Sequence, residues 1–394
     1  MEPNAGSRRP AGSPDRLESP PRIVHVAETI AGGIASFFEE IAPYQNKTFG
    51  EDNVTFVIPA GSEVHLPSID ASQIVTFTAS SRGPGALLSF GRQATAAIRR
   101  LNPDIVHLHS SFAGAVLRFA LGRRKGRTRV IYCPHGWAFA IETSDARKRI
   151  YAAIERWLTR RTDLVIANSE TERQLAISYG LPADTVRTVK NGIGWTPAPS
   201  VRPASDSARR LRLAFIGRHD RQKGIDILLD TIARFPLSHI DFHIVGDSVL
   251  ASGRPGLTAA APNVIFHGWL SRADTMELLR GVDGLVMPSR WDAAPIVAIE
   301  AMRAGVPVIG SDRGAIPEIV RDGVGGLIFE LDQPDSLGRL LERVNADELH
   351  RLGQTARARW EADYSSDRMN ERTIEAYLDV LSRSPVSSAN GRVA

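Results

Sequence analysis

The chain has a single cysteine, Cys133, among 394 residues, so an internal disulfide is excluded and a reducing, cytoplasmic location is expected. No apolar run approaches the about 18–20 residues that a membrane-spanning helix needs. Residues 1–20 lack the apolar segment of a signal peptide and are rich in Pro, Ser, Gly and Arg. They are predicted to be a disordered leader, and residues 385–394 a disordered tail.

Two common ligand motifs are also missing. No D-x-D triplet occurs, so the usual carboxylate pair for Mg²⁺ or Mn²⁺ is absent and we expect neither a metal nor another cofactor. The dinucleotide fingerprint G-x-G-x-x-G is absent as well. His107 and His109 share one face of a predicted strand, a spacing that suits zinc, but no third ligand is evident in the sequence.

The net positive charge of the chain is concentrated in its first half. Residues 21–195 contain 21 Lys and Arg against 15 Asp and Glu, although the whole chain has a net charge of only +4. Within 145–163, apolar residues at helical spacing alternate with arginines: Ile150, Ile154, Trp157 and Leu158 among Arg149, Arg156, Arg160 and Arg161. This face is suited to an anionic membrane surface or an acidic lipid-linked acceptor. The alternatives are a core helix with a solvated basic flank and, with less support, a nucleic-acid surface.

Thirteen short β-rich runs alternate with helical stretches, and they fall into two series. They are residues 22–28, 53–60, 74–80, 104–110, 129–136, 163–169 and 185–192, then 212–218, 240–247, 263–269, 283–289, 307–312 and 325–330. Alternation of strands and helices predicts parallel sheets covered on both faces. We expect one such domain at 21–194, a Pro- and Ser-rich linker at 195–210, a second domain at 211–366 and a C-terminal helix at 367–384.

The stretch from 288 to 320 carries two carboxylates eight positions apart, Asp292 and Glu300. A predicted strand precedes it, Pro295 suits the first turn of a helix, and Gly305 suits the C′ position after that helix. Free N–H groups at the start of such a helix point out from the carboxyl edge of a parallel sheet and bind phosphates. With two carboxylates to accept hydroxyls, the pattern is suited to a nucleotide diphosphate linked to sugars. An ordinary βαβ unit with solvated acids is the alternative.

This stretch resembles the E-x7-E signature of retaining family 4 glycosyltransferases. Their GT-B architecture has two doubly wound, Rossmann-like parallel-sheet α/β domains facing a central cleft. Asp292, one methylene shorter than Glu, stands at the first family position and Glu300 at the second. The resemblance implies that Glu300 accepts ribose hydroxyls and that Asp292 accepts a hydroxyl of the donor sugar. Backbone N–H groups near Pro295, Ile296 and Val297 would bind the diphosphate. The resemblance also implies that the last helix, at 367–382, crosses back onto the first domain.

The second predicted domain opens with two cations close to a strand end. Arg218 follows the strand and Gly217, Lys223 comes five residues after Arg218, and Gly224 precedes a helix. Two cations beside a phosphate site can neutralise the charge that grows on a leaving nucleoside diphosphate. The pattern G-R-x4-K-G resembles the phosphate-binding pair of the family, and a solvated basic loop is the alternative.

The motifs of the first domain are less specific. Gly32 and Gly33 allow a sharp turn after the first strand and resemble the glycine loop that faces the donor diphosphate, although a plain loop also explains them. His135 resembles the histidine that lies near the transferred sugar; a purely structural histidine is the alternative.

Five further positions resemble residues that line the cleft. Asn191 lies in one such segment, although Asn-Gly is a turn signal in any protein, and Gly246 and Gly268 stand where relatives hold the nucleobase. Ser169 and Glu170 also resemble cleft residues and can equally cap a helix.

The resemblance implies a retaining, metal-independent transferase that moves a sugar from a nucleotide-diphosphate donor to a glycan acceptor. We expect His135, Arg218, Lys223, Asp292 and Glu300 to be its catalytic residues. By analogy the acceptor is lipid-linked, the pathway is surface or exopolysaccharide assembly, and the protein lies at the inner face of the plasma membrane without binding nucleic acid. A nucleotide-sugar epimerase of the same fold and a non-catalytic nucleotide-sugar-binding subunit are the alternatives.

Overall fold

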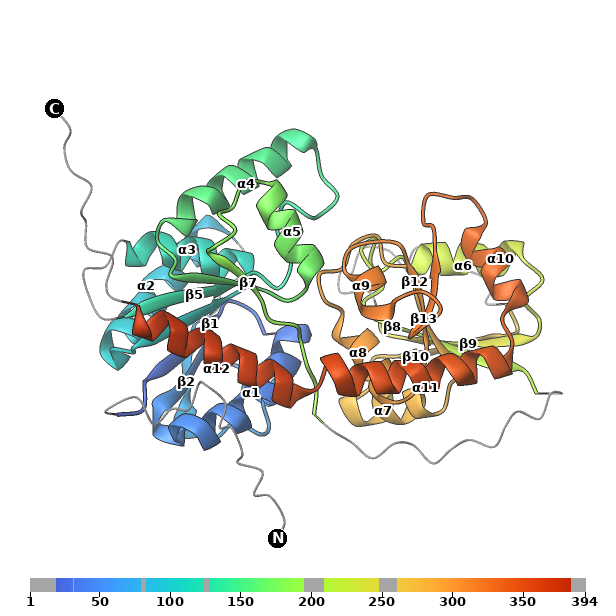
Figure 1. Cartoon of the computed structure of the whole chain (residues 1–394), viewed down its shortest axis with the longest axis horizontal. Helices are drawn as coiled ribbons and strands as arrows, with labels where there is room; N and C mark the ends of the chain where they lie inside the picture. Colours follow the sequence, from blue (N-terminus) through green and yellow to red (C-terminus); the bar gives the residue numbers. More distant parts are fainter. Residues whose placement is uncertain are drawn as a thin grey trace, which may run out of the picture.

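The computed structural model describes residues 19–30, 32–78, 83–122, 128–194, 209–247 and 261–383. Most of the predicted leader and linker, and all of the predicted tail, lie outside these residues. The described part of the chain forms two α/β domains, each built on one parallel sheet (Figure 1). No described helix has both the length and the apolar character that crossing a membrane requires.

The first domain is built on seven strands in the order β3-β2-β1-β4-β5-β6-β7, with all neighbours parallel. The strands are β1 (Ile23–Ala27), β2 (Val54–Pro59), β3 (Ile74–Phe77), β4 (Ile105–His109), β5 (Arg129–Cys133), β6 (Leu164–Ala167) and β7 (Val186–Thr188). The helices are α1 (Gly33–Phe49), α2 (Pro84–Leu101), α3 (Ser111–Leu121), α4 (Asp145–Thr159) and α5 (Glu170–Ser178).

Both faces of this sheet are buried, which explains why its strands are apolar without alternation. Ile23 of β1 packs in a cluster with α1, whereas the next residue, Val24, packs on the opposite face with α2 and α3. Successive residues of a strand point to opposite faces, so a strand covered on both sides must be apolar at nearly every position.

The second domain is built on six strands in the order β10-β9-β8-β11-β12-β13. The strands are β8 (Leu211–Ile216), β9 (Ile240–Val245), β10 (Val264–Gly268), β11 (Gly284–Met287), β12 (Val308–Ser311) and β13 (Gly326–Phe329). The helices are α6 (Ile225–Arg234), α7 (Arg272–Arg280), α8 (Ile296–Arg303), α9 (Ile316–Val320), α10 (Ser336–Arg343) and α11 (Ala346–Asp363). Every predicted β-rich run contains or overlaps one of the thirteen strands, and the predicted fold class of two Rossmann-like parallel-sheet domains is confirmed.

The strand orders locate the binding edge of each sheet. The order reverses between β1 and β4 in the first domain and between β8 and β11 in the second. In open parallel sheets, ligands bind beyond the carboxyl ends of the strands at this reversal. Three of the five predicted catalytic residues, Arg218, Lys223 and Asp292, lie in the loops that follow β8 and β11.

The last helix, α12 (Ser366–Ser382), lies along the first domain, while α11 lies along the second (Figure 1). Its buried residues Met369, Tyr377 and Val380 belong to the cluster that covers one face of the first sheet. The chain crosses between the domains here, and Ile193 exchanges backbone hydrogen bonds with Tyr364 and Ser366 at 3.0 Å each. The segment that leaves the first domain after β7 and the segment between α11 and α12 are thus held together by these two backbone hydrogen bonds.

Candidate active site

The loop after β11 leads directly into α8, as the sequence predicted, but Pro295 has a different place in it. Pro295 is the N-cap residue, with extended backbone, and α8 begins at Ile296. Proline has no N–H, so Pro295 itself cannot donate to a phosphate. The donors available at this end of α8 are the N–H groups of Ile296 and Val297, because the first N–H groups of a helix have no partner within it. The predicted anion-binding end of the helix therefore rests on these two residues.

Lys223 and Asp292, predicted from separate motifs, meet at this point. The Lys223 Nζ lies 2.6 Å from Asp292 Oδ2, and both side chains are largely buried. A Cβ on Gly314 would lie 2.1 Å from the carbonyl oxygen of Asp292, and the N–H of Ala315 donates to that oxygen at 2.8 Å. The loop before α9 thereby fixes the backbone of Asp292, which explains why glycine is required there.

Arg218 does not join this ion pair. Its guanidinium contacts Asp220 at 3.1 Å and donates to Gln222 at 2.8 Å, and its side chain is about half exposed. The two predicted cations therefore differ: Lys223 is held at the base of the site, whereas Arg218 lies on an exposed loop.

Three predicted glycines lie in a row where β8, β9 and β10 end. The N–H of Gly217 donates to Val245 at 3.1 Å, and the N–H of Gly246 donates to the carbonyl of Gly268 at 2.8 Å. Gly246 has φ +117°, and a Cβ there would lie 1.9 Å from the carbonyl oxygen of Gly217. Glycine at 246 is therefore needed for the close approach of the two strand ends.

Glu300 lies one turn into α8 and is buried. Its Oε1 is 3.8 Å from the guanidinium of Arg272 in α7, which also donates to Glu40 of α1 at 3.2 Å. Burial raises the pKa of Glu300, and the nearby Arg272 and Arg303 oppose that effect. The distance to Arg272 is too long for a hydrogen bond, so the carboxylate oxygens retain capacity to accept hydroxyls.

The first domain supports the loop before α8 from the opposite side. Ser169 Oγ donates to the carbonyl of Ala293 at 2.9 Å, and Asn191 Nδ2 donates to the carbonyl of Ala294 at 3.2 Å. A Cβ on Gly33 would lie 3.6 Å from Ile296 Cδ1. Gly33 and Asn191 therefore face the predicted phosphate-binding end, whereas a Cβ on Gly32 would meet nothing within 4 Å.

His135 stands at the end of β5 with φ +51°, a left-handed conformation that is uncommon for a residue other than glycine. Its Nε2 is 2.9 Å from Nδ1 of His109, and Nε2 of His109 is 3.0 Å from Nδ1 of His25. Burial lowers the pKa of His135 and of His25 to about 4. His135 is thus the partly exposed end of a row of neutral rings that extends into the domain.

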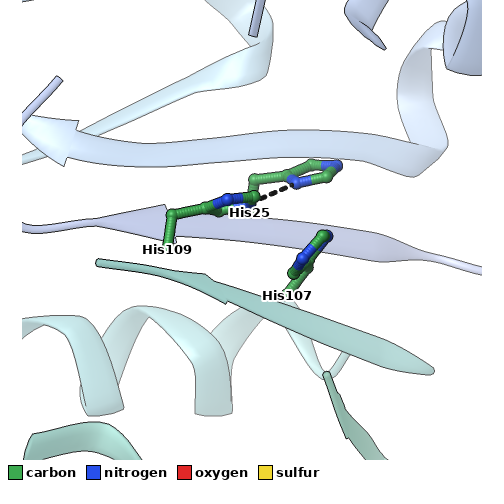
Figure 2. Close-up of side chains that lie close together, drawn as sticks. All are labelled: His25, His107 and His109. Atoms are coloured by element: carbon green, nitrogen blue, oxygen red, sulfur yellow. Dashed lines mark hydrogen bonds between the residues drawn. The ribbon is translucent and has the colours of Figure 1, made fainter. Parts of the chain in front are cut away.

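The sequence offered no third metal ligand beside His107 and His109, but the structure places His25 next to them (Figure 2). One nitrogen of each lies within 4.8 Å of the others, and all three side chains are buried. Figure 2 shows His25 and His109 joined by a hydrogen bond, with His107 beside them. Both ring nitrogens of His25 and of His109 already have hydrogen-bond partners.

Two acidic residues at the domain interface were missed by sequence reasoning. Glu318 accepts from the backbone N–H groups of Glu170 and Thr171, so a carboxylate of the second domain caps α5 of the first. Glu172 is buried, and burial raises its pKa to about 7, with Asp292 adding to the effect. The spacing S-x-x-E from Ser169 to Glu172 is a capping-box pattern that could have identified Glu172.

Comparison with known proteins identifies the family of this chain. Residues 31–194 match the profile "Glycosyltransferase Family 4", and residues 210–347 match "Glycosyl transferases group 1". A Klebsiella pneumoniae protein described as "Uncharacterized 41.2 kDa protein in cps region" is 30% identical over 330 residues, covering 81% of this chain and 89% of that protein. The chain belongs to the family 4, or group 1, glycosyltransferases.

Solved structures show that this glycosyltransferase has the GT-B fold. Anabaena Alr3699/HepE in complex with UDP-glucose superposes with a TM-score of 0.72 at 20% identity, covering 91% of this chain and 99% of that one. The apo form of the lipopolysaccharide outer core galactosyltransferase WaaB superposes with a TM-score of 0.68 at 17% identity, covering 90% and 99%. These similarities extend through both domains.

Proposed function

We propose that this glycosyltransferase transfers a sugar from a nucleotide-diphosphate donor to a lipid-linked glycan acceptor, with retention and without a metal. The observation that carries the proposal is the meeting of Lys223 and Asp292 beside the N-terminus of α8. Lys223, Asp292 and two free N–H groups lie where the strand order of the second sheet reverses, and the buried Glu300 lies one turn further along α8. That set of groups is suited to a diphosphate with a sugar on either side.

Each group has a distinct role in the proposed reaction. Lys223 and the N–H groups of Ile296 and Val297 stabilise the charge that develops on the leaving diphosphate, and Arg218 joins them when the donor binds. Glu300 accepts ribose hydroxyls. Asp292 accepts a hydroxyl of the transferred sugar and exchanges part of its contact with Lys223 for it.

The first domain completes the site. Gly33 permits close approach to the diphosphate, and His135 lies beside the transferred sugar. The acceptor attacks from the face that the diphosphate leaves, and the leaving phosphate takes the acceptor proton. This route needs no protein nucleophile.

The proposed pathway is the assembly of a capsule-like or exopolysaccharide. The similar Klebsiella protein is named for a cps region, and WaaB is named as a lipopolysaccharide galactosyltransferase. The complex of HepE contains UDP-glucose, which supports a nucleotide-sugar donor. These names describe the relatives and provide support for the proposal at the level of the substrate class.

A donor screen tests the proposed function. Purified protein is incubated with UDP-, GDP- and ADP-sugars, with and without EDTA, and both binding and slow hydrolysis are measured. We expect one donor to bind and to be hydrolysed equally well with EDTA, and Glu300→Ala to lose this binding. Binding without hydrolysis or transfer to any acceptor would instead indicate a non-catalytic subunit, and conversion of the donor sugar to its epimer would indicate an epimerase.

The outer surface of α2, α3 and α4 supports a lipid-linked acceptor. A groove of about 840 Å³ with largely apolar walls opens between these helices. Four large apolar side chains at the groove are 41–66% exposed: Leu88, Phe119, Ile154 and Trp157. A core helix with only a solvated basic flank does not account for them, because α4 turns Ile154 and Trp157 outward. Contiguous exposed apolar surface of this kind marks an interaction site.

Cations accompany this apolar surface. Arg92 and Arg99 line the groove, and the guanidinium of Arg161 lies 4.1 Å from the ring centre of Trp157. α2 and α3 contain no Asp or Glu, and one of the two acids of α4, Glu155, is buried against Arg118 at 2.7 Å. Apolar side chains among cations are suited to an anionic lipid surface, and we propose that this face rests on the membrane that carries the acceptor.

Phe119→Glu and Trp157→Glu are each expected to weaken binding to anionic vesicles about tenfold. Each change removes an apolar side chain that the lipid would bury and adds a negative charge that the anionic lipid repels. Sedimentation with phosphatidylcholine vesicles, with and without phosphatidylglycerol, measures this. Trp269→Glu is the matched control, since Trp269 is a 59% exposed aromatic in the second domain. The membrane proposal is wrong if the unmodified protein ignores anionic vesicles or if Trp269→Glu weakens binding equally.

A further inference from the structure

We propose that Gln45, His25 and His109 form a hydrogen-bonded chain that holds His135 in one tautomer, with a bare Nδ1 available to the ligand. The proposal rests on the proposed function for the role of His135 beside the transferred sugar. It assigns a positioning role to three buried residues that do not touch the ligand themselves.

The distances define a continuous chain. Gln45 Oε1 is 2.9 Å from Nε2 of His25, Nδ1 of His25 is 3.0 Å from Nε2 of His109, and Nδ1 of His109 is 2.9 Å from Nε2 of His135. The ring centres of His25 and His109 are 5.3 Å apart, and those of His109 and His135 are 5.1 Å apart. In each pair, the distance between ring centres is longer than the distance between the bonded nitrogens by about the width of one ring. This is the difference expected when both nitrogens lie on the line that joins the two ring centres, so the nitrogens point at each other. These are well-directed hydrogen bonds.

The rings in the chain are neutral at neutral pH. His25 and His109 are fully buried in the first domain, and burial lowers the pKa of both. Phe37, Phe38 and Phe56 contact these rings, and apolar surroundings of this kind disfavour a positive charge. A neutral imidazole has one N–H and one bare nitrogen, so each hydrogen bond fixes the proton position in the next ring.

The acceptor at the inner end sets the direction of the whole chain. We assign the carbonyl oxygen of Gln45 to the side that faces Nε2 of His25, and this assignment places the proton on that nitrogen and leaves Nδ1 bare. That nitrogen accepts from Nε2 of His109, and Nδ1 of His109 accepts from Nε2 of His135. His135 is therefore an Nε2–H tautomer. Its Nδ1 can only accept a hydrogen bond, which selects a hydroxyl of the transferred sugar over a carboxylate.

The same geometry disfavours a metal at the histidine cluster. A metal bound by His25 and His109 would replace the 3.0 Å bond between them and turn both rings away from their common line. His107 has a different partner: its Nδ1 is 2.7 Å from the hydroxyl of Tyr377 in α12, and its ring is tilted by 37° from that of His109 with centres 4.1 Å apart. Tyr377 also contacts Gln45, so His107 meets the inner end of the chain through Tyr377. It serves as a control because its hydrogen bond goes to Tyr377 and not to the row that ends at His135.

The tautomers are measured directly by long-range ¹H–¹⁵N correlation spectra of protein labelled with ¹⁵N-histidine, without any donor. We expect Nε2–H tautomers for His25, His109 and His135, and a mixture of tautomers at His135 in Gln45→Leu. Gln45→Glu, which keeps an acceptor oxygen, should restore the single tautomer. An Nδ1–H tautomer at His135 in the unmodified protein would overturn the proposal, as would a stoichiometric metal found by elemental analysis.

Kinetics with the donor found by the screen give a second readout. We expect His109→Phe to lower kcat/KM about tenfold and His107→Phe to change it less than twofold, since both replace a fully buried ring on β4. If both variants lose kcat/KM equally, the hydrogen-bonded row of histidines has only a structural role and does not position His135. Because the spectra need no activity, absence of any transfer would refute the proposed function and leave the tautomer assignment standing on its own measurement.

Discussion

Lys223→Ala is expected to lower kcat/KM for sugar transfer by about 10²–10³-fold, the range seen when a preorganised group that stabilises transition-state charge is removed. Lys223 Nζ lies 2.6 Å from Asp292 Oδ2, in the loop that leads into the N-terminus of α8, and supplies a positive charge there. Its loss also leaves the largely buried Asp292 without its partner. Steady-state transfer kinetics with the preferred donor measure the effect.

Arg234→Ala provides the control for Lys223→Ala. Arg234 belongs to the same domain and also forms ion pairs, with Asp230 and Asp335, but it is half exposed at the far end of α6. We expect this variant to retain kcat/KM within about twofold, because exposed ion pairs contribute little. If Lys223→Ala transfers sugar at a near-normal rate, and circular dichroism is unchanged in both variants, Lys223 does not have the proposed role in catalysis.

The fold was predictable because its signals are local. Each strand is a short apolar run between turn residues. The stretch from β11 through α8 is continuous in the sequence and includes the strand, the N-cap residue of the helix and the glycine that follows its C-terminus. Lys223 and Asp292 were identified separately, and their meeting follows from the parallel order of β8 and β11. Local pattern and topology together were sufficient for this part of the site.

The remaining features depend on register and on long-range packing. His25 pairs with His107 across neighbouring strands, although they are far apart in the sequence, and nothing around His25 marks it as a partner. The contact of Glu318 with α5 and the link from Arg272 to Glu40 each require the two domains to be in place. The orientation of Arg218 depends on its neighbours Asp220 and Gln222, and a motif does not specify a side-chain direction.

The buried histidines lead to a second large effect, on stability at acidic pH. Burial lowers the pKa of His25 and His135 to about 4, and that of His107 and His109 well below the ordinary value near 6.5. Below pH 6.5 the unfolded chain binds protons that the folded chain does not, so the free energy of unfolding falls with decreasing pH. Above pH 6.5 these rings are neutral in both states and contribute no pH dependence. The maximum slope is about 1.4 kcal/mol per pH unit for each histidine.

The raised pKa values of buried glutamates act in the opposite direction. The pKa of Glu172 is about 7 and that of Glu300 is also raised, so these groups favour the folded state as the pH falls toward their unfolded values. The histidines should prevail, because four rings with large shifts oppose few carboxylates. We expect the free energy of unfolding, measured by urea titration at closely spaced pH values, to fall steeply from pH 6.5 to 4.5. His107→Phe should lower the slope of the free energy of unfolding against pH by the contribution of one proton, about 1.4 kcal/mol per pH unit at most. His65→Gln, at an exposed histidine, should leave this slope unchanged. A free energy of unfolding that stays level through this range would mean that the histidine cluster is solvated or charged in the folded protein.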